Sequence, residues 1–445
     1  MSETGGTQLA PVTGQSRIDV IDMLRGFAIL GIFFMNIPYM ATRLADLFVD
    51  PRSVGSTPLD QASWTAVQVV LEGTQRGMLE LLFGAGLMVL ARRAMEPDGP
   101  VAVADLYARR NLWLLAFGLF DIFVLLWAGD ILHVYALAAL FLFPFRKLGP
   151  KLLLGLGLAF AAYVLVSGGI RYAERADLMA RTVAAQKLQA EGKALSEKDR
   201  KALTDWQKSV ERRRTGGEEI AGLRKQEEQS RTGLLAYAGY NIGTWITFVA
   251  PSLIDTVPEA FCMMLIGLAL FKWGVIQGGR STRFYLLLML ACYAAGMPLR
   301  WIGAQEALTM LPLPRSFWMT TEIARIAVSI GHVALINLLV RAAAGRLLLA
   351  PFKAAGRMAF SLYFLQTILG MWILFAPWGP GLWGKLGWAE LYGIVLAAIA
   401  AQLVLANLWL RFFASGPLEW LWRSLAYVQR QPFRRPSQNH LATAT

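Results

Sequence analysis

Long apolar runs alternate with short polar segments along most of the chain. A run of about 20 apolar residues is long enough to cross the hydrocarbon core of a bilayer as a helix. We therefore predict an all-α fold, a polytopic transmembrane helical bundle of about ten spans. The predicted spans cover residues 24–41, 66–91, 111–128, 131–145, 152–168, 256–272, 284–303, 319–340, 358–376 and 389–411.

Two segments depart from this pattern. Residues 169–233 are densely charged and dominated by Ala, Glu, Lys and Arg, which favours a helical insertion outside the membrane. Residues 234–253 are apolar and rich in Tyr and Trp, which predicts an interfacial or re-entrant helix ended by Pro251 rather than a further span. The predicted organisation is a disordered tail (1–16), a half with five spans (17–168), the insertion (169–233), a second half with five spans (234–428) and a basic tail (429–445).

The composition agrees with a membrane protein, because 56% of the residues are hydrophobic and only 16% are charged. Soluble domains carry about 25% charged residues. The net charge of +13 would suit a nucleic-acid-binding protein if the chain were soluble, but the basic residues fall between the apolar runs. We expect membrane lipids and no nucleic acid as partners.

Orientation follows from the distribution of Lys and Arg, which concentrate in cytoplasmic loops. Alternate short loops and the C-terminal tail hold nineteen basic residues, whereas the other short loops hold four. This asymmetry predicts that both termini are cytoplasmic and that the insertion lies on the opposite side.

Ionisable side chains inside spans cost free energy, about 2.5–3.5 kcal/mol each on the insertion scale, so each needs a structural or functional reason. Arg25 and Asn36 are eleven residues apart, which returns a helix to nearly the same face after a rise of about 16 Å. Asp22 lies one turn before Arg25. The three side chains predict a polar stripe that faces a wet cavity, or a structural pair at the membrane rim.

Further polar groups recur at helical spacing. Arg76 and Glu80 follow Glu72 at intervals of four in the second predicted span, and could pair within one helix. Asp130 and His133 are three residues apart in "GDILHVYAL", a spacing that suits a general-base pair or a packing arrangement. We predict a shared polar cavity that receives side chains from the first, second and fourth spans. The wider set of candidate binding residues is Asp22, Arg25, Asn36, Arg76, Glu80, Tyr135, Tyr363 and Gln366.

No metal site is expected, because the three histidines are widely separated and no HExxH or EF-hand pattern occurs. Cys262 and Cys292 lie in apolar runs without a neighbouring cysteine and are interpreted as small core residues.

Several motifs resemble a known family. They are "RIDVIDMLRGFAILGIFFMNI", "LLFGAGLMVLARRA", "GDILHVYALAALFLFPFR", "GRMAFSLYFLQTIL", "GLWGKLGW" and "GPLEWLWRSLAY". They resemble the YeiB-like family of bacterial inner-membrane proteins, which is distantly similar to membrane acyltransferases of the heparan-α-glucosaminide N-acetyltransferase type.

The resemblance implies an acyltransferase that takes an acyl group from a cytoplasmic thioester, with acyl-CoA as co-substrate and no permanently bound cofactor. The acceptor would be an extracytoplasmic or lipid-linked group such as a glycan. The resemblance implies that Arg25 lies on the donor side, and that the base is His133, oriented by Asp130, or an acidic group. An ion-coupled transporter or permease and a non-catalytic membrane scaffold remain alternatives.

Overall fold

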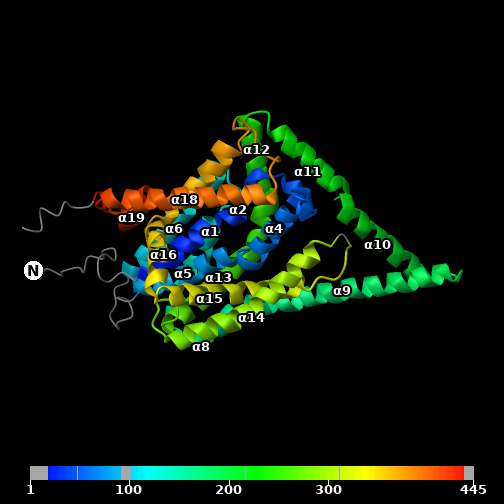
Figure 1. Cartoon of the computed structure of the whole chain (residues 1–445), viewed down its shortest axis with the longest axis horizontal. Coiled ribbons are helices and arrows are strands. Elements are labelled where there is room, and N and C mark those ends of the chain that lie inside the picture. Colours follow the sequence, from blue (N-terminus) through cyan, green and yellow to red (C-terminus); the bar gives the residue numbers. More distant parts are fainter. Residues whose placement is uncertain (1–18, 48, 92–101, 216, 310, 435–445) are drawn as a thin grey trace, which may run out of the picture.

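A computed structural model describes residues 19–47, 49–91, 102–215, 217–309 and 311–434. Within these ranges the chain is a bundle of helices, and the only β-type pairing is an isolated bridge between Phe413 and Arg434 (Figure 1). The predicted all-α fold is therefore confirmed. The predicted tail 1–16 and residues 435–445 of the basic tail lie outside the described residues.

The α-helices differ widely in length, from a single turn to nine turns. They are α1 (Asp19–Gly31), α2 (Phe33–Ala41), α3 (Leu44–Leu47), α4 (Pro58–Val70), α5 (Thr74–Ala91), α6 (Ala102–Phe123), α7 (Leu132–Leu140), α8 (Pro150–Gly157), α9 (Ala159–Ala190), α10 (Glu197–Thr215), α11 (Gly217–Ser230), α12 (Leu234–Thr244), α13 (Ala250–Lys272), α14 (Thr282–Ala307), α15 (Phe317–Leu339), α16 (Ala343–Arg357), α17 (Ala359–Thr367), α18 (Trp388–Phe412) and α19 (Pro417–Tyr427). Two π-helical segments, η4 (Trp245–Val249) and η5 (Ile368–Leu374), continue α12 and α17, and two 3₁₀ turns are η2 (Pro51–Ser53) and η3 (Phe143–Lys147).

Six helical segments in the described part of the chain are long and apolar enough to span a bilayer. They are 19–41, 150–190, 234–272, 282–307, 317–339 and 388–412, and α16 with α17 and η5 would add a seventh as a pair bent by 77°. The other predicted spans correspond to shorter or more polar helices. The predicted span 66–91 is divided between α4 and α5, and the predicted span 131–145 contains only the nine-residue α7 and the turn η3.

The prediction of a separate interfacial helix ended by Pro251 is wrong. α12, η4 and α13 run on without a break as one 39-residue helix. Pro251 is tolerated because it follows the π-helical segment and sits in the first turn of α13, where its missing N–H is accommodated. At 1.5 Å per residue this helix is about 58 Å long, nearly twice the hydrocarbon core of about 30 Å. A bilayer can therefore cover only about half of this helix.

The centre of the bundle is built around α1 and α5. The apolar window of α1 and α2 is 72% buried, whereas that of α14 is 11% buried, so α1 is central and α14 peripheral. Gly26 and Gly356 let α1 and α16 touch backbone to backbone. Gly84 lies against the backbone of α13 in the same way, whereas a Cβ at Gly86 would meet open space.

The charged insertion forms a long arm, defined as the second half of α9 with α10 and α11. α9 leaves the bundle and runs out to a tip, from which α10 and α11 return to α12 (Figure 1). The expected boundary at residue 168 is not a break, since α9 continues straight from the predicted span into the arm. At the other end of the bundle, Asp19 pairs with Lys353 (2.7 Å) and Arg357 donates to the carbonyl of Ala414 (3.0 Å). Both ends of the described chain therefore lie on one side, opposite the arm.

Candidate functional site

A cavity of about 430 Å³ lies between the bundle and the returning end of the arm. Its walls come from α2, α12, η4, the turn before α5, the segment before α7 and the end of α11. Its polar and aromatic lining residues are Asn36, Tyr39, Thr42, Glu72, Arg76, Trp127, Glu227, Ser230, Arg231, Tyr237, Tyr240, Asn241, Thr244, Phe248 and Trp383. A cavity with mixed charges, amides and aromatic rings suits a polar organic ligand.

The predicted stripe on the first span is divided by the structure. α1 and α2 run on as one helical segment over residues 19–41, but the two ends of the stripe have different surroundings. Asn36 lines the cavity, and its Nδ2 is buried without a hydrogen-bond partner among the described residues. Asp22 and Arg25 pair at 3.2 Å near the start of α1, where α16 packs, and neither lines the cavity.

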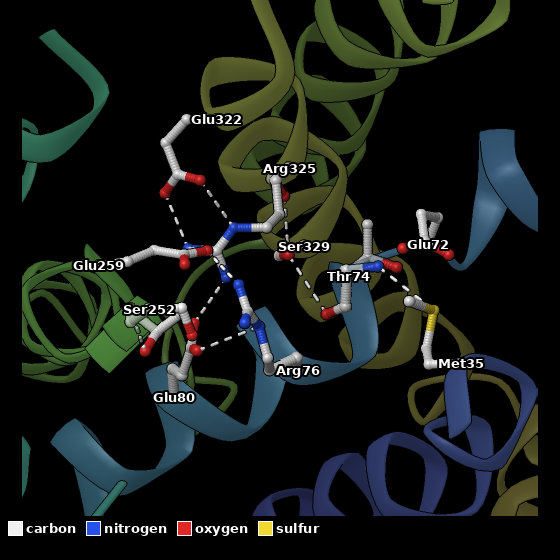
Figure 2. Close-up of polar contacts among 12 residues, drawn as sticks. Met35, Glu72, Thr74, Arg76, Glu80, Ser252, Glu259, Glu322, Arg325 and Ser329 are labelled. Carbon is white, nitrogen blue, oxygen red and sulfur yellow. Dashed lines mark hydrogen bonds and ion pairs between the residues drawn. The ribbon is translucent and has the colours of Figure 1, made fainter. Parts of the chain in front are cut away.

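Arg76 and Glu80 belong to a buried cluster of five ionisable groups, shown in Figure 2. Arg325, with 6% of its side chain exposed, contacts Glu80 (2.6 Å), Glu322 (2.7 Å) and Glu259 (3.0 Å). Arg76 bridges Glu80 (Nε to Oε1, 3.5 Å) and Glu259. We call these five residues the charged cluster; they come from α5, α13 and α15.

The expected stripe of Glu72, Arg76 and Glu80 on one helix is wrong for Glu72. α4 ends at Val70 and α5 begins at Thr74, and Gly73 between them has a φ of +68°, in the left-handed region that favours glycine. Glu72 therefore lies in the turn and lines the cavity. The turn is held by Arg300, which donates to the carbonyl oxygens of Gln68 (3.1 Å) and Glu72.

Asp130 and His133 form a buried pair behind the cavity wall. The Asp130 carboxylate contacts His133 Nδ1 (2.9 Å), accepts from the His133 backbone N–H (2.9 Å) and accepts from the Tyr363 hydroxyl (3.1 Å). His133 Nε2 is buried without a hydrogen-bond partner in the part of the chain that the structure describes. When Nδ1 carries the proton, Nε2 presents a lone pair, which is the state of a histidine general base.

The neighbours of this pair connect it to the cavity and to the charged cluster. Gly129 and Ile131, on either side of Asp130, line the cavity. On α7, Tyr135 donates to the backbone carbonyl of Arg76 (3.1 Å).

Gln366 lies apart from both groups. It donates to the carbonyl of Ile29 (3.1 Å) and to Gln402 (3.2 Å). The structure therefore joins Asp130, His133 and Tyr363 in one group, joins Tyr135 to the charged cluster, and leaves Gln366 as a support for α1.

Sequence reasoning missed the contribution of the arm. Glu227 accepts from the backbone N–H of Leu44 (2.6 Å) and from the Tyr240 hydroxyl (2.9 Å), and burial raises the pKa of Glu227. Arg231 donates to the carbonyl of Phe375 (2.6 Å) and lies 4.5 Å from the ring of Trp383. The available signal was the helical spacing of four charged residues within the insertion, namely Arg224, Glu227, Glu228 and Arg231.

Within the described ranges, no group of three or more His, Cys, Asp or Glu residues is arranged to hold a metal ion. The site therefore offers acid–base groups, a guanidinium, amides and aromatic rings as its chemistry.

Comparison with known proteins identifies the family. Residues 270–429 match the family described as "Protein of unknown function (DUF418)". The "Uncharacterized protein YxaH" of Bacillus subtilis (strain 168) is 31% identical, and the alignment covers 97% of this chain and 100% of that protein. The "Uncharacterized protein YeiB" of Escherichia coli (strain K12) is 26% identical over 91% of this chain and 95% of its own.

A third relative, the "Uncharacterized 39.9 kDa protein in amylase 3'region" of Bacillus acidopullulyticus, is 25% identical over 95% of this chain and 97% of its own. No solved structure matches. With apolar helices able to span a bilayer and full-length similarity to YxaH and YeiB, the chain belongs to the YeiB-like family, whose C-terminal region carries the DUF418 domain.

Proposed function

We propose that this protein is an acyltransferase of the bacterial inner membrane, with both termini in the cytoplasm and the arm on the opposite side. It would move an acyl group from a cytoplasmic acyl-CoA to a hydroxyl or amine of an extracytoplasmic or lipid-linked acceptor. The observation that carries the proposal is the Asp130–His133 pair, whose Nε2 is buried and has no partner among the described residues.

The geometry of this pair matches the needs of acyl transfer. Asp130 fixes the orientation of the His133 ring through its contact with Nδ1 (2.9 Å), while Tyr363 donates to the second carboxylate oxygen of Asp130 (3.1 Å). His133 Nε2 would take the proton of the acceptor hydroxyl as the acceptor oxygen bonds to the acyl carbonyl carbon. The C–S bond of the thioester then breaks, and the proton passes from Nε2 to the departing thiolate of CoA. Nδ2 of Asn36, which lines the cavity and has no hydrogen-bond partner among the described residues, would donate to the carbonyl oxygen.

Several arginines lie on the side of the bundle that holds the two ends of the described chain, and we expect them to bind the phosphates of the donor. Arg25 contacts Asp22 (3.2 Å), Arg109 contacts Asp105 (2.9 Å) and Arg110 lies 4.4 Å from the ring of Trp422. A donor phosphate would compete with these partners. Arg92 and Arg93, also expected on this side, lie outside the described residues.

An ion-coupled transporter is the second candidate, and the charged cluster favours it. Among the described residues, the ion pairs of Glu80, Glu259 and Glu322 are made with Arg76 and Arg325, so the five groups carry a formal charge of −1. Arg76 also lines the cavity. An excess buried carboxylate is the kind of group that couples transport to a proton or cation.

The test makes the same substitution, histidine to glutamine, at two buried histidines. His133→Gln should lower acyl-CoA-dependent release of free CoA by about 10²-fold or more, since a general base contributes about 10²–10⁴-fold. His332→Gln is the matched control, because both nitrogens of His332 already contact Tyr293 (2.7 Å) and the Val70 carbonyl (2.8 Å). Activity is measured on purified protein in nanodiscs with acetyl-CoA or longer acyl-CoAs and extracted envelope lipids and glycans.

Folding of each variant is checked by gel filtration and thermal melting. The acyltransferase proposal is refuted if acyl-CoAs at millimolar concentration neither shift the melting temperature nor release CoA. Proton- or cation-driven uptake into proteoliposomes would then support the transporter.

A further inference from the structure

A second cavity, of about 500 Å³, lies between α11 and α12. It shares four lining residues with the first cavity, namely Ser230, Tyr240, Thr244 and Phe248. These four side chains therefore form a common wall. We propose that the second cavity, here called the arm groove, is the entrance to the first and that Tyr240 with Glu227 is its gate.

The gate is one side chain held by one hydrogen bond across two helices. Tyr240 lies on α12 and donates to Oε1 of Glu227 on α11 (2.9 Å). Glu227 is itself fixed by the backbone N–H groups of Leu44 (2.6 Å) and Ala45 (3.4 Å). Because Tyr240 borders both cavities, a rotation of its ring or a small withdrawal of α11 would join them.

The attachment of α11 to the bundle suits such a withdrawal. Its outer contacts are ion pairs, Arg224 to Asp46 (2.8 Å) and Glu228 to Arg43 (3.5 Å). Arg224 is 42% exposed and Glu228 is 63% exposed, so water and salt screen both pairs. α11 can therefore move without exposing a tightly packed apolar surface.

The lining of the arm groove indicates the class of ligand. All of its lining residues are uncharged, although the arm around it is densely charged. Gln226, Gln229, Ser230 and Thr247 offer neutral donors and acceptors, and Phe248 offers an aromatic face. This surface fits an uncharged, hydroxyl-rich chain, such as a neutral oligosaccharide, and would not attract the phosphates of CoA. The inference extends the proposed function by calling this ligand the acceptor, but its test needs no transfer activity.

Two glycines make the route testable without disturbing the packing. Gly239 and Gly243 line the arm groove, and a Cβ added at either would have no heavy atom within 4 Å. Gly239→Leu and Gly243→Leu should therefore fill the groove in a folded protein. Gly222→Leu on α11 and Gly169→Leu on α9 are matched controls, because a Cβ at each also meets open space and neither lines a cavity described above.

The readout is the rate at which a reporter cysteine inside the first cavity reacts. The reporter is Thr42→Cys in a variant whose native Cys262 and Cys292 are replaced by Ser. Thr42 lines the first cavity but not the arm groove. A membrane-impermeant methanethiosulfonate reagent is added from the arm side of proteoliposomes. The two groove-filling variants should slow labelling by about tenfold, the control glycine variants should leave it unchanged, and Tyr240→Phe should speed it by severalfold.

The route is refuted if the groove-filling variants label as fast as the controls. The ligand class is tested by protection of the same cysteine with maltohexaose and with an equally long anionic hexagalacturonate. Maltohexaose should slow labelling and hexagalacturonate should not. Equal protection by both, protection by the anionic chain alone, or protection by neither would overturn the ligand class. Since no outcome depends on acyl transfer, failure here is distinguishable from failure of the proposed reaction.

Discussion

Replacing Arg325 tests whether the charged cluster is as deeply buried as its contacts indicate. Arg325→Met leaves Glu80, Glu259 and Glu322 with Arg76 as their remaining cationic partner within the cluster. Removing one member of a buried ion pair costs about 3–5 kcal/mol, because the remaining charge stays buried without compensation. Arg325→Lys keeps the charge but loses the two-pronged contact with Glu322, so its expected cost is smaller, about 1–3 kcal/mol.

The free energy of unfolding is measured by denaturant titration in detergent micelles. Arg181→Met is the control, since Arg181 contacts Asp177 at 2.8 Å but both side chains are 57% exposed, and its cost should stay below about 1 kcal/mol. The double variant Arg325→Met with Glu322→Gln should recover part of the loss, because one uncompensated carboxylate is neutralised. If Arg325→Met costs no more than Arg181→Met, the cluster is not buried as described and the reasoning fails.

Two further predictions concern the helix contact at α1 and the arm. Gly356→Ala should lower the free energy of unfolding by about 1–3 kcal/mol, because its Cβ would overlap a carbonyl oxygen of α1. Gly86→Ala, measured by the same denaturant titration, should raise the free energy of unfolding by about 0.5–1 kcal/mol. Equal effects of the two substitutions would contradict the close contact between α1 and α16. Burial raises the pKa of Glu227, which faces Asp46 and the Tyr240 hydroxyl, so its contribution to stability is present below the ordinary carboxyl pKa of 4.5 and is lost as the pH rises through the raised value. Glu227→Gln should flatten the decline of the free energy of unfolding as the pH rises above 4.5, and an unchanged slope there would assign the decline to another group.

Local spacing was enough to find groups that contact each other within one helical turn. Asp130 and His133 are three residues apart, and the contact between them needs only a helical turn. The apolar runs likewise predicted a membrane bundle, because burial of backbone polar groups in lipid permits little else. These inferences depend on residue spacing and on the length of apolar runs, both of which are read directly from the sequence.

The charged cluster could not be assembled in the same way. Glu259 and Arg325 were visible as polar residues within apolar runs, but their pairing depends on which helices pack together. That arrangement follows from contacts between residues 183 or 245 positions apart, such as Arg76 with Glu259 and Glu80 with Arg325. Apolar periodicity shows that a helix has a buried face without showing its neighbour.

The breaks in helices were misjudged for a related reason. Glu72 was assigned to a continuous helix because its spacing to Arg76 fits one, yet Gly73 adopts a left-handed conformation that ends the pattern. Pro251 was taken as a helix end, although a π-helical turn before it absorbs the missing hydrogen bond. In both cases the backbone conformation of the neighbouring residues, rather than residue type or spacing, determined whether the helix ended.

α9 runs without a break from an apolar segment long enough to span a membrane into the charged arm, so a tilt of its first half would also move its second half. The segment that includes α8 and α9 is 41 residues long, about 60 Å, so roughly half of it projects beyond a bilayer core of about 30 Å. A membrane helix answers a change in bilayer thickness by tilting. A tilt of only about 5° would carry a rigid projection of about 30 Å sideways by about 2.6 Å at its tip, close to the length of one hydrogen bond. We therefore expect a change in bilayer thickness to displace the tip of the arm, from which α10 and α11 return to α12 (Figure 1).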